Sequence, residues 1–145
     1  MLDAALRAAD TGRAMSQENV ELARRVVDAV NRRDLGALLA LMDPDVEAGS
    51  LLVAVEGGYH GHDGIRRWWG NLLGAFPDYT IEVLELRAVD DWTLANVNIH
   101  GHGAGSHMPV ELTVWLAAQW QRTKCVTWRA FDRRDEALEA VGLRE

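Results

Sequence analysis

The stretch Ala95-Asn96-Val97-Asn98-Ile99-His100 alternates apolar and polar residues, and this alternation decides the class of fold. Successive side chains of a β-strand point to opposite faces, so a period of two predicts a strand with one buried face. The same period recurs before it, in Tyr79-Thr80-Ile81-Glu82-Val83, and after it, over residues 113–120. A tight turn at 121–124 then leads to a last strand over 125–132. The second half of the chain therefore predicts an antiparallel meander of four strands.

Towards the N-terminus the apolar residues change to the three- and four-residue spacing of amphipathic helices. Ser16, with glutamates in the turn that follows, predicts an N-cap and a helix over about 16–32. Asp34 is expected to cap a second, shorter helix, which Asp43-Pro44 ends because the residue before a proline avoids helical geometry. The remaining elements are a short strand and loop between Val46 and Gly58, a third helix over about 63–75 and a terminal helix over 132–143.

Length and composition indicate a single globular domain. The chain has 145 residues, of which 48% are hydrophobic and 26% are charged, and these values are typical of one domain with one core. We predict that residues 1–15 form a flexible N-terminal extension, since termini are commonly poorly ordered, and that residues 16–145 form the domain. An ordered accessory helix over the first residues is the alternative.

Charge and cysteine content narrow the partners and the compartment. The net charge is -7 and the arginines are scattered among acids, so no face is expected to attract nucleic acid. Cys125 is the only cysteine, which excludes an internal disulfide and fits a reducing compartment. Residues 1–14 lack the apolar run of a signal peptide or a membrane span. We therefore expect a cytoplasmic protein with neither a nucleic-acid nor a membrane partner.

Several segments, taken in order, resemble SnoaL-like proteins of the nuclear transport factor 2-like superfamily. They are Asn31-Arg32-Arg33-Asp34-Leu35, Asp43-Pro44-Asp45-Val46, Tyr59-His60-Gly61-His62-Asp63-Gly64-Ile65, Trp68-Trp69 and the closing segment over 128–143. The resemblance covers about residues 16–143. It implies an α+β, cone-shaped nuclear transport factor 2-like fold, in which three N-terminal helices pack on a curved antiparallel sheet around a central pocket. Relatives with this fold include ketosteroid isomerases, SnoaL-type polyketide cyclases, scytalone dehydratases and limonene epoxide hydrolases.

The known catalytic groups of two such relatives have no counterparts here. By register, the phenol donor of the ketosteroid isomerase pattern falls at Val26, its general base at Ser50 and its protonated carboxylic acid at Leu116. A valine cannot donate a hydrogen bond and a leucine cannot stabilise an oxyanion, so steroid-type enolisation is disfavoured. These three residues are expected to line the ligand pocket instead. The epoxide hydrolase pattern needs Arg-x-Asp where this chain has Asn96-Val97-Asn98, which disfavours that reaction too.

Asp132, Tyr59 and His60 are the candidate catalytic residues. Asp132 alternates with Trp128 and Ala130, so its carboxylate is expected to point toward the cavity mouth. Burial beside indoles would raise its pKa and suit it to acid–base chemistry. The alternative is that Asp132 caps the terminal helix. Tyr59 and His60 precede the third helix, where they could orient a substrate oxygen or move a proton, or could belong to an ordinary surface loop.

The histidines allow weaker alternatives. His60-Gly61-His62 and His100-Gly101-His102 each place two imidazoles on one face of an extended chain, which could form half a metal site. No carboxylate is spaced to complete such a site, and the first pair lies at a helix start, so we predict no metal and no cofactor. His107 and Glu111 are either a catalytic pair or part of a solvated turn.

Six tryptophans in so short a chain imply either a bulky core or an aromatic-walled cavity. Trp68 and Trp69 lie about 100° apart on a helix, so only one of them borders the pocket. Register favours Trp69, with Trp128 opposite. Trp115 lies on the outer strand face, where an exposed indole suggests a homodimer interface.

Two functions remain open from the sequence. The first is a cofactor-independent acid–base enzyme, namely an isomerase, cyclase, dehydratase or hydrolase, acting on an apolar polycyclic or terpenoid-like compound. The second is a non-catalytic domain that binds a hydrophobic ligand or only dimerises, which the lost catalytic positions favour. In both cases the expected partners are a small apolar molecule and a second copy of the chain, bound through the outer sheet face.

Overall fold

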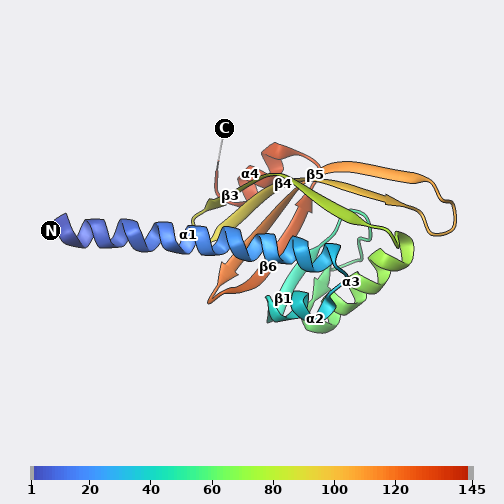
Figure 1. The fold of residues 1–145 in the computed structure, drawn as a ribbon, viewed down its shortest axis with the longest axis horizontal. Coiled ribbons are helices and arrows are strands. Elements are labelled where there is room, and N and C mark those ends of the chain that lie inside the picture. Colours follow the sequence, from blue (N-terminus) through green and yellow to red (C-terminus); the bar gives the residue numbers. More distant parts are fainter. Residues whose placement is uncertain (1, 144–145) are drawn as a thin grey trace.

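Helices and strands follow one another in the order that the sequence predicts, except that a second short strand precedes the third helix. The computed structural model describes residues 2–143, with side chains from residue 15 onward. The elements are α1 (Leu2–Asn31), α2 (Leu35–Ala40), β1 (Met42–Gly49), β2 (Tyr59–His60), α3 (Gly61–Ala75), β3 (Thr80–Val89), β4 (Trp92–His102), β5 (Pro109–Gln121), β6 (Lys124–Phe131) and α4 (Arg134–Ala140). Figure 1 shows α1 crossing one face of a curved sheet, and α2 contacts both α1 and α3.

The strands form one six-stranded sheet in the order β2-β1-β6-β5-β4-β3. The predicted meander is confirmed, because β3, β4, β5 and β6 pair antiparallel, each with the next. The sheet as a whole is mixed rather than antiparallel, because β1 runs parallel to β6. Parallel neighbours need a long crossover connection, and here the chain from β2 through β5 supplies it.

The link between α2 and β1 confirms one prediction and corrects another. Asp34 caps α2 as predicted, since its carboxylate accepts a hydrogen bond from the N–H of Ala37 at 3.0 Å. Asp43-Pro44 does not end this helix, which has already finished, and lies instead within β1. Pro44 has no N–H for the strand ladder, and the pairing of β1 with β6 is irregular between Met42 and Glu47. Such irregular positions are where a sheet tolerates proline.

The first helix is longer than predicted. α1 begins at Leu2, so the predicted N-cap at Ser16 is wrong. The physical reason is that residues 2–14 are rich in strong helix formers, against which the single Gly12 costs only about 1 kcal/mol. That residues 1–15 are a flexible extension stays a prediction. None of the described helices is both long enough and apolar enough to cross a membrane.

The two faces of the sheet carry separate clusters of buried side chains. The main core lies between the inner face and α1, α2 and α3. α4 covers part of the outer face, where Trp115 borders a smaller cluster and the Arg134 guanidinium lies 5.7 Å from the centroid of its ring. The predicted exposed indole is therefore wrong, and Trp115 is half-buried because the terminal helix folds back beside it. The smaller cluster consists of Leu94, Ala117, Ala137, Leu138 and Val141.

Candidate functional site

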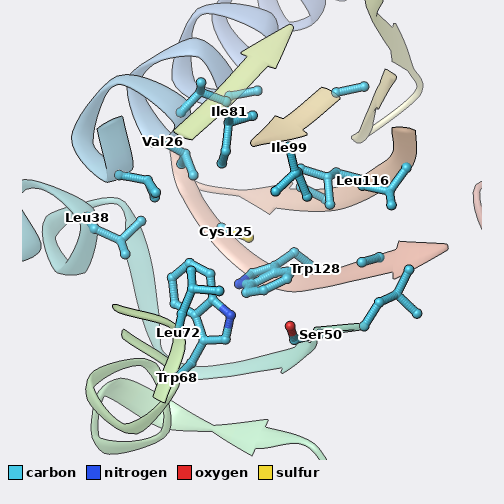
Figure 2. A pocket seen from close by; sticks show the side chains of 18 of the residues that line it. Val26, Leu38, Ser50, Trp68, Leu72, Ile81, Ile99, Leu116, Cys125 and Trp128 are labelled. Atoms are coloured by element: carbon cyan, nitrogen blue, oxygen red, sulfur yellow. The ribbon is translucent and has the colours of Figure 1, made fainter. Parts of the chain in front are cut away.

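An apolar cavity of about 100 Å³ lies between the inner face of the sheet and the helices that cover it. Figure 2 shows aliphatic side chains from helices and strands pointing into it, together with indole rings. Its indoles are those of Trp68, Trp120 and Trp128. Leu51 and Leu112 also line it and are 45% and 38% exposed, so the cavity wall extends to the surface. This hollow is the candidate ligand site.

Four residues predicted to line a pocket lie in the wall of this cavity: Val26, Ser50, Leu116 and Trp128. Val26 comes from α1, Ser50 follows the end of β1, and the other two come from neighbouring strands of the sheet. Leu116 reaches the cavity because alternate residues of β5 face inward, as a strand with one buried face requires.

Trp68, not Trp69, faces the cavity. Trp68 is 6% exposed, and its ring meets that of Trp128 edge to face, with the ring centroids 5.1 Å apart and the planes at 73°. Trp69 is half-buried and lies outside the wall. The correction follows from the phase of α3, because Ile65, Trp68 and Leu72 share its buried face at three- and four-residue spacing. Trp69 lies about 100° further round the helix.

Thr93, Trp120 and Cys125 are among the wall residues that were not predicted. Thr93 and Trp120 are joined across two strands, since the indole N–H donates to the threonine hydroxyl at 2.9 Å. Extending the alternation of β4 by one step from Ala95 would have found Thr93. Cys125 could not be found in this way, because the register of β5 with β6 shifts between Gln119 and Trp120 and changes which residues of β6 face inward.

No residue that is charged at neutral pH lines the described cavity. Its two titratable groups are the thiol of Cys125 and the phenol of Tyr79. Burial raises the pKa of Cys125 to about 12, and burial also raises the pKa of Tyr79 above its ordinary value. Both groups are therefore neutral at physiological pH. A charged ligand would lose its hydration here without gaining an ion pair, which is strongly unfavourable.

Asp132 lies outside the cavity. Trp128 and Ala130 line the wall, as their alternation predicts, but β6 ends before Asp132, whose side chain is exposed. The expected burial of this carboxylate beside indoles is therefore wrong. The alternative of a helix cap also fails, because α4 begins at Arg134 and its N-cap residue is Arg133, which makes no side-chain cap bond. A catalytic role for Asp132 stays a prediction without support from its position.

Tyr59 and His60 form the short strand β2 rather than a loop at the rim. Tyr59 is only 2% exposed, and its hydroxyl donates to the carbonyl of Val53 and accepts from the amide of Asn71 at 3.0 Å. The exposed His60 has its Nδ1 atom 3.8 Å from the carboxylate of Glu47. Neither residue lines the cavity. The structure thus brings none of the three candidate catalytic residues to the cavity wall.

The histidine pairs do not converge on one site. His62 makes a hydrogen bond with a main-chain carbonyl at 2.9 Å, whereas Nδ1 of His102 lies 2.6 Å from the carboxylate of Asp78. His107 and Glu111 are both exposed. Within residues whose side chains are described, no group of three or more histidine, cysteine or acidic residues is arranged to hold a metal ion.

The fold and the cavity define the class: an α+β cone of the nuclear transport factor 2-like type, with the predicted helices, curved sheet and central hollow. The sequence profile of the SnoaL-like domain matches residues 23–132, which is more than half of the chain. The chain therefore belongs to the SnoaL-like family. No curated protein matches the chain in sequence.

Solved structures agree on the fold. A candidate SnoaL-like polyketide cyclase from Jannaschia sp. is 16% identical, with a TM-score of 0.71, over 81% of this chain and 86% of its own. A hypothetical protein with a ketosteroid isomerase-like fold from Catenulispora acidiphila, in complex with trimethylamine, is 14% identical, with a TM-score of 0.70, over 85% and 93%. A candidate hydroxylase from Streptomyces galilaeus is 20% identical, with a TM-score of 0.66, over 88% and 82%. These similarities establish the shared fold.

Proposed function

We propose that this protein binds a small, uncharged, apolar molecule in the cavity between α1, α3 and the sheet, and that the cavity wall itself supplies no acid–base catalyst. The observation that carries the proposal is the composition of this wall, which is aliphatic and aromatic, with Ser50, Thr93 and neutral Cys125 and Tyr79 as its polar residues. Apolar hollows with few polar groups are the usual form of small-molecule sites. A cytoplasmic location, proposed from the lone cysteine, is consistent with this role.

The cavity volume favours a ligand of about one ring. An engineered apolar cavity of about 150 Å³ holds benzene, and this cavity measures about 100 Å³. The polycyclic or terpenoid-like compound that the family resemblance implies would need the mouth to widen. Leu51 and Leu112 border the mouth and are exposed, so a larger ligand would displace the segment around Leu51 first.

The second candidate function is an acid–base enzyme. It is favoured by the relatives of this fold described as a candidate polyketide cyclase and a candidate hydroxylase. For this function, Asp132, Tyr59 or His60 would have to reach a ligand from outside the described cavity wall. We test it with a panel of apolar ketones, epoxides and polyketides. Our binding proposal expects either no turnover or turnover that both Asp132→Asn and His60→Ala retain. If the wild type converts a compound and either variant loses this activity, the protein is an enzyme instead.

A cavity-filling variant tests the binding proposal. Ala118 lines the cavity, so Ala118→Leu should fill part of it, whereas the exposed Ala140 on α4 offers the matched control Ala140→Leu. Small neutral ring compounds are titrated while thermal unfolding is followed. A ligand at about 100 times its Kd stabilises the folded state by about 2.7 kcal/mol. We expect this stabilisation in the wild type and in Ala140→Leu, and its loss in Ala118→Leu.

Two outcomes would contradict the binding proposal. The first is that no neutral ring compound raises the midpoint of thermal unfolding of the wild type. The second is that Ala118→Leu, folded by circular dichroism, binds as well as the control, because the ligand would then lie elsewhere.

A further inference from the structure

The three indoles of the cavity wall differ in how their N–H groups are satisfied. Trp120 is 4% exposed, and its N–H donates to Thr93 at 2.9 Å. Trp68 is almost as buried, at 6% exposed, yet its N–H meets no acceptor among the described side chains and main chain. The N–H of Trp128 likewise has none in that part of the chain. Neither nitrogen is among the fully buried unpaired side-chain atoms of the described residues, so both N–H groups keep some accessible surface. These two donors are therefore available to a bound molecule.

The available donors lie on one side of the cavity. The rings of Trp68 and Trp128 are 5.1 Å apart and edge to face, and Figure 2 shows both indole nitrogens on the side where the Ser50 hydroxyl lies. An edge-to-face contact can point only one of the two ring edges at the other ring, so at least one N–H remains for a ligand. The Ser50 oxygen accepts from the N–H of Val53 at 3.4 Å, and its own proton is left to donate.

The other side of the cavity is hydrocarbon. Figure 2 shows Val26, Ile81, Ile99 and Leu116 around it, away from the indole nitrogens. A molecule that fits both sides therefore has an apolar body and one end that accepts hydrogen bonds. A carboxylate would also accept them, but no cation lines the described cavity to pair with its charge.

We propose that Trp68, Trp128 and Ser50 are the specificity-determining residues of the cavity, and that they select an uncharged ligand with a carbonyl-type oxygen on an apolar ring or chain. The indole N–H groups and the serine hydroxyl hold this oxygen, and the aliphatic side chains hold the body. The inference rests on the proposed binding function and adds which group of the ligand is recognised and by which atoms. Trp120 takes no part because Thr93 already accepts its N–H.

A pair of isosteric ligands tests the inference. Cyclohexanone and methylenecyclohexane have nearly the same shape, and only the ketone accepts hydrogen bonds. The hydrocarbon leaves water more readily than the ketone, so the two Kd values in one protein do not report hydrogen bonding alone. We therefore measure both Kd values by NMR titration and compare their ratio between the wild type and each variant. Trp68→Phe removes the N–H and keeps an aromatic ring, and Trp69→Phe is the matched control outside the wall. We expect Trp68→Phe to weaken ketone binding relative to the hydrocarbon by roughly 3- to 10-fold, and the control to change the ratio less than about twofold.

A second measurement follows the wild-type protein, and variants serve only to assign its signals. Each of the six tryptophans gives one indole N–H signal in a nitrogen–proton correlation spectrum, and the signals lost in Trp68→Phe, Trp69→Phe and Trp128→Phe assign those of the three residues. Cyclohexanone should move the signal of Trp68 or Trp128 downfield, and methylenecyclohexane should not. Cyclohexanecarboxylate at neutral pH should bind more weakly than the ketone.

The outcomes separate this inference from the proposed function. If both neutral ligands bind, but the ratio is unchanged in Trp68→Phe and neither indole signal moves with the ketone, the donor assignment is wrong and the binding function stands. Tighter binding of the carboxylate than of the ketone would overturn the requirement for an uncharged ligand. If neither neutral ligand binds, the proposed function and the inference fail together.

Discussion

The side-chain amide of Asn31 makes two hydrogen bonds with the main chain of Ile81, donating to its carbonyl at 2.9 Å and accepting from its N–H at 2.8 Å. Ile81 lies on β3, which is an edge strand of the sheet. The last residue of α1 thus satisfies two main-chain groups that the edge leaves unpaired, as a neighbouring strand would. The contact fixes the end of α1 over the inner face of the sheet, where Ile81 lines the cavity.

Asn31→Ala should therefore destabilise the fold. Both groups on Ile81 lose their partners, and we expect the free energy of unfolding to fall by about 1–2 kcal/mol, since water replaces part of the loss at an exposed edge. Chemical denaturation measures this change. Arg32→Ala is the control, because it removes an exposed ion pair with Asp28 at 3.0 Å, and such pairs contribute little. Equal effects of the two variants would show that the bonds to Ile81 add nothing specific.

Two glycines of α3 should respond to alanine in opposite directions. A Cβ atom at Gly64 would lie 2.9 Å from the main-chain carbonyl carbon of Tyr59, whereas one at Gly70 would meet nothing within 4 Å. We expect Gly64→Ala to lower the free energy of unfolding by about 1–3 kcal/mol through overpacking. Gly70→Ala should raise it by about 0.4–1 kcal/mol by restricting the unfolded chain. Thermal and chemical unfolding of both variants check the signs, and a stable Gly64→Ala would mean that β2 and α3 are not packed this closely.

The regular strands were predictable, and their irregularities were not. A period of two holds along β4 and β5, so the strand face that carries Leu116 was predictable from the sequence, and the family resemblance implied that this residue lines the pocket. The shift between Gln119 and Trp120 breaks this period and brings Cys125 into the wall, where alternation could not place it. Asp132 is a related case, because the alternation in the sequence continues to this residue whereas β6 ends at Phe131.

The helices were predictable in existence but not in phase or extent. Two adjacent tryptophans on α3 are equally apolar, so only the packing of Ile65 and Leu72 decides that Trp68 faces inward. The start of α1 was misjudged because an N-cap signal at Ser16 also occurs inside a continuous helix when the preceding residues favour helix formation. Local propensity thus located the elements, and tertiary contacts decided which side chains form the cavity.

The homodimer through the outer sheet face stays a prediction and can be tested on β5. Asn96 and Asn98 lie on this face of β4, beside β5. Thr113 is exposed and pairs with Asn98. Thr113→Glu would place a negative charge on both copies near Glu111, so it should shift a dimer to monomer in light scattering after gel filtration. Ala104→Glu, in an exposed turn, should not. A monomeric wild type at all concentrations would contradict the prediction.

The thiol of Cys125 should be unreactive in the folded protein. Burial raises its pKa to about 12, so its thiolate fraction is small at moderate pH. An unfolded cysteine has a pKa of about 8.5, and at that pH we expect the native thiol to react with iodoacetamide roughly a thousandfold more slowly than the thiol in denaturant. The folded state favours the neutral thiol, so the raised pKa contributes to the stability of the fold. This stabilisation is present below about pH 8.5 and is lost as pH rises toward 12. Equal rates in the native and denatured protein would show that the cavity region opens readily.

Asp78 and His102 should make stability depend on pH in the acid range. The side-chain hydrogen bond from His102, with a second from its main-chain N–H, lowers the pKa of Asp78 below its ordinary value. A lowered folded-state pKa adds stability above the unfolded value of about 3.9, and this stability is lost as pH falls through the lower folded value. The difference in Tm between the wild type and Asp78→Asn should therefore be positive at about pH 5 and shrink below about pH 4. Carbon-detected NMR titration of the carboxyl group gives the direct check: His102→Ala should return the pKa of Asp78 part of the way toward its ordinary value, since the main-chain bond remains. A difference in Tm that grows on acidification would mean that the ionised Asp78 destabilises the fold, and that its bonds to His102 do not hold this end of β4.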